Sequence, residues 1–139
     1  KKSQEKTLWY IQKGIAEGGK LVAGGMKQSE EGYYLRPTII ANVKPNDTIA
    51  QEEIFAPVLA VIKAKNFDDG LKIANNTEFG LTGAVYTKNK QRLKKAEQEF
   101  HVGNLYLNRK CTKRHSRTPR TVSSHQFCDD WRMVTTFFN

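Results

Sequence analysis

Hydrophobic positions alternate between helical and strand spacing over the first 112 residues of the chain. Leu8, Ile11 and Ile15 recur at spacings of three and four, which predicts one face of a helix. Gly18-Gly19 supplies a left-handed stop for that helix. A short strand is then predicted over residues 20–23, closed by a second glycine pair.

Residues 33–43 are predicted to be extended, because Pro37 excludes a helix and favours an edge position in a sheet. The apolar run 58–62 is typical of a strand buried on both faces. Asp68 is expected to cap a helix that Asn75-Asn76 ends. The remaining predicted elements are a strand over 81–86, a helix over 88–100 and a strand over 104–107.

This order of strand, helix, strand, helix, strand indicates right-handed crossovers and an α/β fold with a mostly parallel sheet flanked by helices. In the helix over 88–100, Leu93, Ala96 and Phe100 are expected to face the core. The pattern predicts three helices in all. We therefore expect part of the sheet surface to meet a partner segment.

Length and composition set further bounds. The chain has 139 residues, enough for one compact domain but short for two, and its apolar fraction of 38% permits a core. Its apolar stretches are far shorter than the roughly 20 residues that span a bilayer. It begins at Lys1 with neither a methionine nor a secretory leader, as a segment of a longer protein would. Two cysteines make no disulfide framework and favour a reducing, intracellular setting.

The net charge of +9 would favour polyanions at low salt. The basic residues form no dense stripe, and a positive solvated surface is the commoner meaning of such a charge. A non-catalytic basic module that binds nucleic acid or a partner subunit remains an alternative function.

The composition changes abruptly after Thr112. All ten glycines precede it, and residues 113–139 contain no Gly, Ala, Leu or Ile. We therefore predict two parts, 1–112 and a divergent basic tail over 113–139, which we interpret as an out-of-frame translation. If that is right, another reading frame past codon 112 encodes a glycine-rich continuation.

The tail also holds a set of potential zinc ligands, Cys111, His115, His125 and Cys128. Their spacing is not a recurrent zinc-finger pattern, so we predict no metal site and regard both cysteines as ordinary thiols. His101 is expected to be a surface residue that follows a helix, not a catalytic base.

The most informative stretch is Gln51-Glu52-Glu53-Ile54-Phe55-Ala56-Pro57, directly before the apolar run 58–62. A carboxylate on such a loop can accept hydrogen bonds from vicinal hydroxyls such as those of a ribose. A neighbouring aromatic ring can pack against a flat heterocycle. The alternative is a solvated acidic turn with Phe55 anchored in the core.

This stretch, with Gly32-Tyr33-Tyr34-Leu35-Arg36-Pro37 before it and Phe79-Gly80-Leu81-Thr82-Gly83 after it, resembles the aldehyde dehydrogenase superfamily in order and spacing. The segment 100–112, which contains Gly103-Asn104-Leu105-Tyr106-Leu107-Asn108-Arg109, is similar to the Δ1-pyrroline-5-carboxylate (glutamate semialdehyde) dehydrogenase branch. The resemblance covers residues 4–112. It implies a segment from the latter part of the catalytic domain.

The resemblance implies NAD-dependent oxidation of glutamate semialdehyde to glutamate in proline catabolism, with NADP not excluded as the cofactor. A cysteine thiolate adds to the aldehyde in this chemistry, and a hydride leaves for the nicotinamide. By the same resemblance, Glu53 binds the nicotinamide ribose, Phe55 packs beside the nicotinamide and Thr112 contacts the substrate. The nucleophile, the general base and the dinucleotide-binding domain precede the matched segment, so no catalytic residue is assigned.

The remaining expectations follow from this fragmentary character. The chain is expected to be inactive alone and to associate with itself or with full-length subunits, in the cytoplasm or in the mitochondrial matrix of a eukaryote. No membrane partner is expected. Two departures from the family are visible: Ala56 replaces a usual glycine, and Lys113-Arg114 replaces a glycine-containing loop. Alanine would be strained at position 56 only if the backbone φ there is positive.

Overall fold

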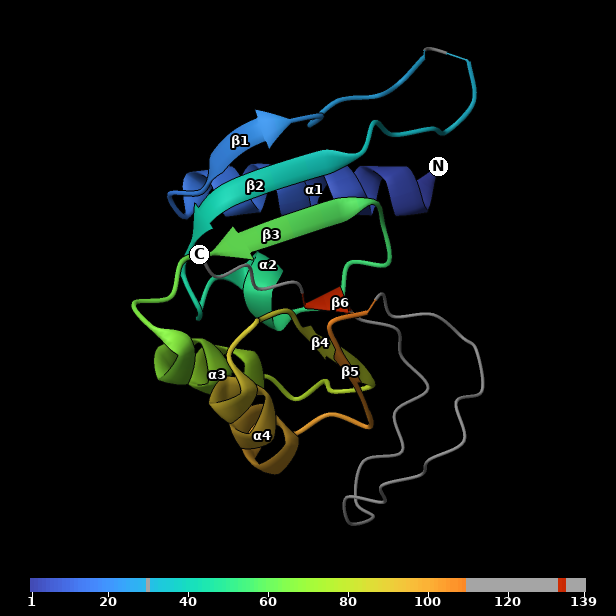
Figure 1. Ribbon diagram of the computed structural model, residues 1–139. Helices are drawn as coiled ribbons and strands as arrows, with labels where there is room; N and C mark the ends of the chain where they lie inside the picture. The colour runs from blue at the N-terminus through green and yellow to red at the C-terminus, as the bar shows by residue number, and fades with distance from the viewer. Residues whose placement is uncertain (30, 110–132, 135–139) are drawn as a thin grey trace. The chain divides into compact units, whose positions relative to one another are not determined.

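The computed structural model describes residues 1–29, 31–109 and 133–134 (Figure 1). The chain divides into two compact units, with the boundary between Lys63 and Ala64. Each unit has a three-stranded sheet and a hydrophobic cluster of its own. From its length the chain was expected to form one compact domain, and this division was not predicted. The boundary predicted at residue 112 lies outside the described residues and stays a prediction.

The first unit contains helix α1 (Lys2–Ala16), strands β1 (Lys20–Ala23) and β2 (Thr38–Val43), the short helix α2 (Thr48–Gln51) and strand β3 (Val58–Ile62). The α1 helix lies across one face of the sheet (Figure 1). Gly18, which follows α1, has a φ of 104°, as predicted for the stop. The predicted apolar face of α1 is only partly right, because Ile11 is buried but Ile15 is 41% exposed.

The strand order in the first unit is β1-β2-β3, with β1 antiparallel to β2 and β2 parallel to β3. The edge position predicted from Pro37 is wrong, because β2 lies in the centre. Pro37 precedes the strand, so the first N–H that the strand must pair belongs to Thr38, and it donates to the Pro57 carbonyl at 2.8 Å. The run 58–62 is a strand as predicted, but it is an edge strand and only half-buried along its length.

The second unit contains helix α3 (Phe67–Asn75), strand β4 (Thr82–Val85), helix α4 (Lys90–Glu99) and strands β5 (Asn104–Leu107) and β6 (Met133–Val134). Both β5 and β6 pair with β4 in parallel. Ala96 and Phe100 are buried as predicted, and Leu93 packs against the same cluster. The cap of α3 is Asn66 and not Asp68, since the Asn66 side chain accepts a hydrogen bond from the Asp69 N–H at 2.9 Å.

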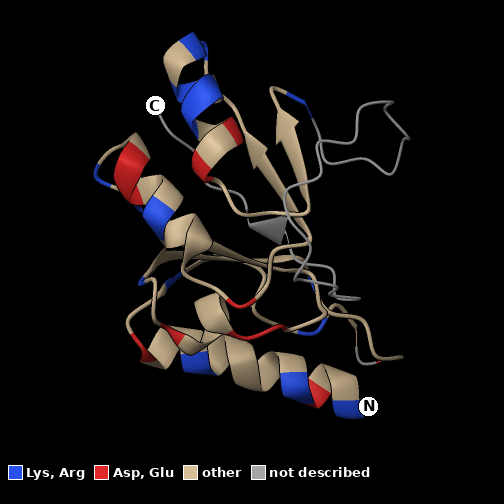
Figure 2. Cartoon of the chain, turned by 90° about the horizontal axis from the view of Figure 1, so that it is seen from below, with Lys and Arg blue, Asp and Glu red and all other residues tan. Residues whose placement is uncertain are grey.

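The α/β fold class is confirmed. Three of the four strand pairings in the described part of the chain are parallel, although they lie in two sheets. Among these residues the structure has four helices, one more than predicted, because α2 was missed. Charged residues lie mainly on the helices and connections, and the strands are almost free of them (Figure 2). None of the described helices is long and apolar enough to cross a membrane.

Candidate cofactor-binding loop

The predicted site lies on the loop of residues 52–57, which connects α2 to β3 in the first unit. The loop is held where it enters the sheet. The Val58 N–H donates to the Ala56 carbonyl at 2.7 Å, and the Pro57 carbonyl accepts the hydrogen bond from Thr38 on β2. The 52–57 loop is therefore fixed to the central strand at its C-terminal end.

Glu53 and Phe55 have different environments on this loop. Glu53 is half-buried, and its Oε1 atom is shielded from solvent. The Phe55 side chain is 65% exposed. The alternative in which Phe55 anchors the turn in the core is therefore wrong, because this ring lies outside both buried clusters.

The backbone of the loop is strained at Phe55, which has a φ of 52°. A left-handed conformation is a genuine outlier for a bulky residue and persists where the surrounding structure enforces it. Ala56 does not have a positive φ. The alanine that replaces the family glycine is therefore not strained, which answers the question that the sequence left open.

The N-terminal end of the 52–57 loop is held by α1. The Tyr10 hydroxyl donates to Glu52 Oε2 at 2.7 Å, and Tyr10 itself is only 5% exposed. One turn earlier in α2, Thr48 donates to Glu17 from both its N–H, at 2.9 Å, and its hydroxyl, at 2.7 Å. The Thr48 hydroxyl, above all, lowers the pKa of the Glu17 carboxyl.

The loop fits the nicotinamide nucleoside that the sequence resemblance implied. A partly shielded carboxylate suits the acceptance of hydrogen bonds from ribose hydroxyls, since these bonds are stronger away from water. An exposed ring two residues later offers an apolar face to a heterocycle. Both side chains belong to one short loop of the first unit, so their suitability for the nucleoside does not depend on residues of the second unit.

The other predicted residues divide into two groups. His101 is exposed, as expected, and its N–H donates to Asn75 Oδ1 at 2.9 Å. The substrate contact assigned to Thr112, the departure at Lys113-Arg114 and the potential zinc ligands Cys111, His115, His125 and Cys128 lie outside the described residues. Within residues 1–29 and 31–109, no group of three His, Cys, Asp or Glu residues is arranged to hold a metal ion.

Sequence reasoning missed Tyr10 and Glu17. Both were part of a helix predicted from its apolar spacing alone, and their partners are 42 and 31 residues away in the chain. The pattern of a single sequence contains no signal for such long-range hydrogen bonds.

The aldehyde dehydrogenase family model matches residues 1–121. The chain belongs to this family. It is 53% identical over 110 residues to the 1-pyrroline-5-carboxylate dehydrogenase of Bacillus pumilus and 54% identical over 110 residues to that of Bacillus subtilis. Each match covers 79% of the chain but 21% of the relative. The chain thus spans about a fifth of the length of the curated relatives it matches.

The solved structures agree with this assignment. The crystal structure of 1-pyrroline-5-carboxylate dehydrogenase from Thermus with bound NAD is similar to the chain with a TM-score of 0.77 and 50% identity. The similarity covers 80% of this chain and 21% of the Thermus enzyme. The predicted resemblance is confirmed, and it favours the dehydrogenase interpretation over a basic interaction module.

Proposed function

We propose that this chain is part of an NAD-dependent aldehyde dehydrogenase that oxidises 1-pyrroline-5-carboxylate, as glutamate semialdehyde, to glutamate in proline catabolism. The identity of 53% over 110 residues to an enzyme of that name supports this proposal most strongly. NADP is a second possible cofactor. By family resemblance, Thr112 contacts the substrate, and the cytoplasm, or a mitochondrial matrix in a eukaryote, is the expected compartment.

The described part of the chain would bind the cofactor and leave the chemical step to other residues. Glu53 would accept hydrogen bonds from the nicotinamide ribose hydroxyls, and Phe55 would pack beside the nicotinamide ring. When bound, NAD supplies the acceptor for the hydride of the aldehyde. The buried Glu53 Oε1 limits the positions that the carboxylate can take, which favours one orientation of the ribose.

A chimeric enzyme tests this proposal. In it, residues 4–112 replace the aligned segment of the Bacillus pumilus dehydrogenase, and we expect NAD-dependent oxidation of pyrroline-5-carboxylate to be retained. Glu53→Gln is expected to raise the KM for NAD about tenfold or more, because hydrogen bonds to a charged acceptor are lost. Phe55→Ala is expected to raise it as well, by loss of ring contact.

Matched controls separate these effects from general damage. Glu78→Gln removes an exposed carboxylate from the second unit, and Tyr33→Ala removes a ring that is 63% exposed. Neither is expected to change the KM for NAD. An unchanged KM in both the Glu53 and the Phe55 variants would contradict the assigned cofactor contacts.

A further inference from the structure

One face of α1, extended by its C-cap residue Glu17, contacts both ends of α2 through three residues. Tyr10, Gly14 and Glu17 are spaced four and three residues apart, so they lie on the same side of the helix. Their contacts on α2 and its C-cap run in the opposite direction along the chain: Glu52, Ile49 and Thr48. The two helices therefore meet along a matched, antiparallel set of contacts.

The middle contact allows the close approach of the two helices. A Cβ atom built on Gly14 would lie 2.5 Å from Ile49 Cδ1 and 3.1 Å from its Cγ2. Such distances are far below ordinary van der Waals contact, so a larger residue at position 14 would displace Ile49. Ile49 is 5% exposed and belongs to the core cluster of the first unit.

The outer contacts are hydrogen bonds to carboxylates, which are stronger than those to neutral groups. The Tyr10 ring is itself held, by an edge-to-face contact with Trp9 at 5.0 Å between centroids and by the Lys6 ammonium at 5.5 Å from its centroid. The Tyr10 hydroxyl is thus a fixed donor. It reaches the residue from which the 52–57 loop starts.

That loop needs such support, because Phe55 is held in a left-handed conformation. Strain of this kind persists only where neighbouring contacts determine the backbone on both sides. On the C-terminal side, the bond from Thr38 to the Pro57 carbonyl does so. On the N-terminal side, the Glu52 N–H donates to the Thr48 carbonyl at 2.9 Å, and the Glu52 side chain accepts the hydrogen bond from Tyr10.

We propose that Tyr10 is a positioning residue for the cofactor-binding loop: from α1 it fixes Glu52, and through it the placement of Glu53 and Phe55. This inference rests on the proposed function, in which these two residues bind the nicotinamide nucleoside. Tyr10 does not contact the cofactor in this arrangement. It sets the geometry in which the two cofactor contacts are made.

Hydrogen exchange on the full chain, followed by mass spectrometry, tests the positioning without any cofactor. Tyr10→Phe removes only the hydroxyl, and we expect the amides of the segment 48–58 to exchange about tenfold faster, the effect of losing one strong hydrogen bond. Tyr33→Phe, the same change at a residue that is 63% exposed, should leave that segment unchanged. Equal exchange in Tyr10→Phe and in the unmodified chain overturns the proposal.

A second variant covers the case in which Tyr10→Phe also disturbs the core. Glu52→Ala removes the acceptor from an exposed side chain, whereas Glu52→Gln keeps an acceptor oxygen. We expect faster exchange of the segment 48–58 in Glu52→Ala and substantial rescue in Glu52→Gln, with β1 and β2 unaffected in both. No acceleration in Glu52→Ala also overturns the proposal.

Kinetics of the chimeric enzyme then connect the positioning to cofactor binding. Tyr10→Phe is expected to raise the KM for NAD several-fold with little change in the KM for the aldehyde. If Glu53→Gln raises the KM for NAD but Tyr10→Phe does not, the positioning role fails and the proposed function stands. If neither Glu53→Gln nor Phe55→Ala changes it, the proposed cofactor contacts fail, and the exchange experiment still decides whether Tyr10 orders the loop.

Discussion

The backbone conformation and packing of this chain depend on particular residues at particular positions. Phe55 adopts the left-handed conformation in the 52–57 loop, which costs about 1–2 kcal/mol of conformational free energy. At the next position the backbone φ is not positive, so Ala56 can replace the family glycine without strain. At Gly83 on β4, by contrast, the space around the residue requires a glycine. A Cβ atom there would lie 2.6 Å from Phe100 Cζ and 3.1 Å from Val102 Cγ1, so the absence of a side chain is what lets Phe100 pack.

We predict that Gly83→Ala lowers the free energy of unfolding of the second unit by about 1–3 kcal/mol, because the added methyl group overpacks the ring. Thermal melting, followed by circular dichroism, measures the change. Phe100→Leu combined with Gly83→Ala makes room for the methyl group, so the two substitutions should be less damaging together than their sum. Simple additivity would show that the ring is not the obstacle.

At the scale of elements, the α1–α2 contact includes a titratable group. The hydrogen bonds from Thr48, its hydroxyl first, lower the pKa of Glu17 below its usual range in the folded chain. A carboxyl with a lowered folded pKa stabilises the fold above its unfolded pKa and loses that contribution as the pH falls through its folded pKa. Lys13, whose Nζ lies 3.4 Å from Glu17 Oε1, forms a partly exposed ion pair with it and adds little to stability.

We therefore expect Glu17→Gln to lower the melting temperature of the chain at pH 7, and the difference from the unmodified chain to shrink below about pH 4 as Glu17 is protonated. Melting curves between pH 3 and 7 measure this. Glu78→Gln, at an exposed carboxylate of the second unit, is the control. A difference that stays constant with pH would contradict a role for the Glu17 charge.

The elements that could be predicted from sequence are those whose own residues show a clear hydrophobic pattern. The strands β3, β4 and β5 are apolar runs between turn signals, and α4 has its inward residues at helical spacing. The four-residue α2 is too short to show a period, so it was missed. The central position of β2 was not predicted, because a proline excludes a hydrogen bond only at its own N–H, and Pro37 lies just before the strand.

The candidate site was predictable only in part, for a similar reason. Glu53 and Phe55 lie two residues apart in a recognisable motif. The contact of their loop with Tyr10 was not predictable, because a hydrogen bond between residues 42 positions apart forms only in the folded chain. The left-handed φ of Phe55 was also not predicted, because a bulky residue rarely adopts this conformation and its residue type gives no sign of it.

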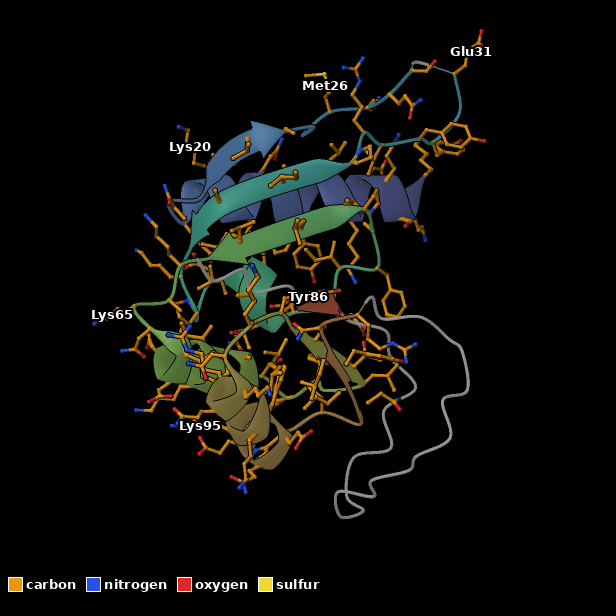
Figure 3. All side chains as sticks on the ribbon, viewed as in Figure 1. Lys20, Met26, Glu31, Lys65, Tyr86 and Lys95 are labelled. Atoms are coloured by element: carbon orange, nitrogen blue, oxygen red, sulfur yellow. The ribbon has the colours of Figure 1, made fainter. Side chains whose placement is uncertain are left out.

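At the scale of the whole molecule, the chain exposes apolar side chains that a complete enzyme of this family could cover. On the first unit they include Val22 on β1 and, on the connection that follows it, Met26 and Tyr34, exposed by 58%, 55% and 70%. Figure 3 shows Met26 on this connection, with its side chain directed outward. All four residues of β1, at one edge of its sheet, are exposed.

We predict that the isolated chain self-associates, because an exposed apolar sheet edge favours association. We also predict that it has no NAD-dependent aldehyde oxidation of its own, because no catalytic nucleophile is assigned to it. Analytical ultracentrifugation over a range of concentrations, with an activity assay, tests both parts. Val22→Lys should reduce the association, while Gln91→Lys, which adds the same charge at an exposed position of α4, should not. A concentration-independent monomer, or turnover by the chain alone, would contradict the corresponding part.

The boundary between Lys63 and Ala64 gives each half of the molecule a core of its own. We therefore expect a destabilising substitution in one of these cores to affect mainly the unit that contains it. A methyl group that crowds Phe100 acts on one cluster, while Ile11 and Ile40 belong to the other, so we expect the first unit, which contains the 52–57 loop, to be the less destabilised of the two. Inherited changes in the two halves would then be tolerated or purged separately, each against its own margin of stability.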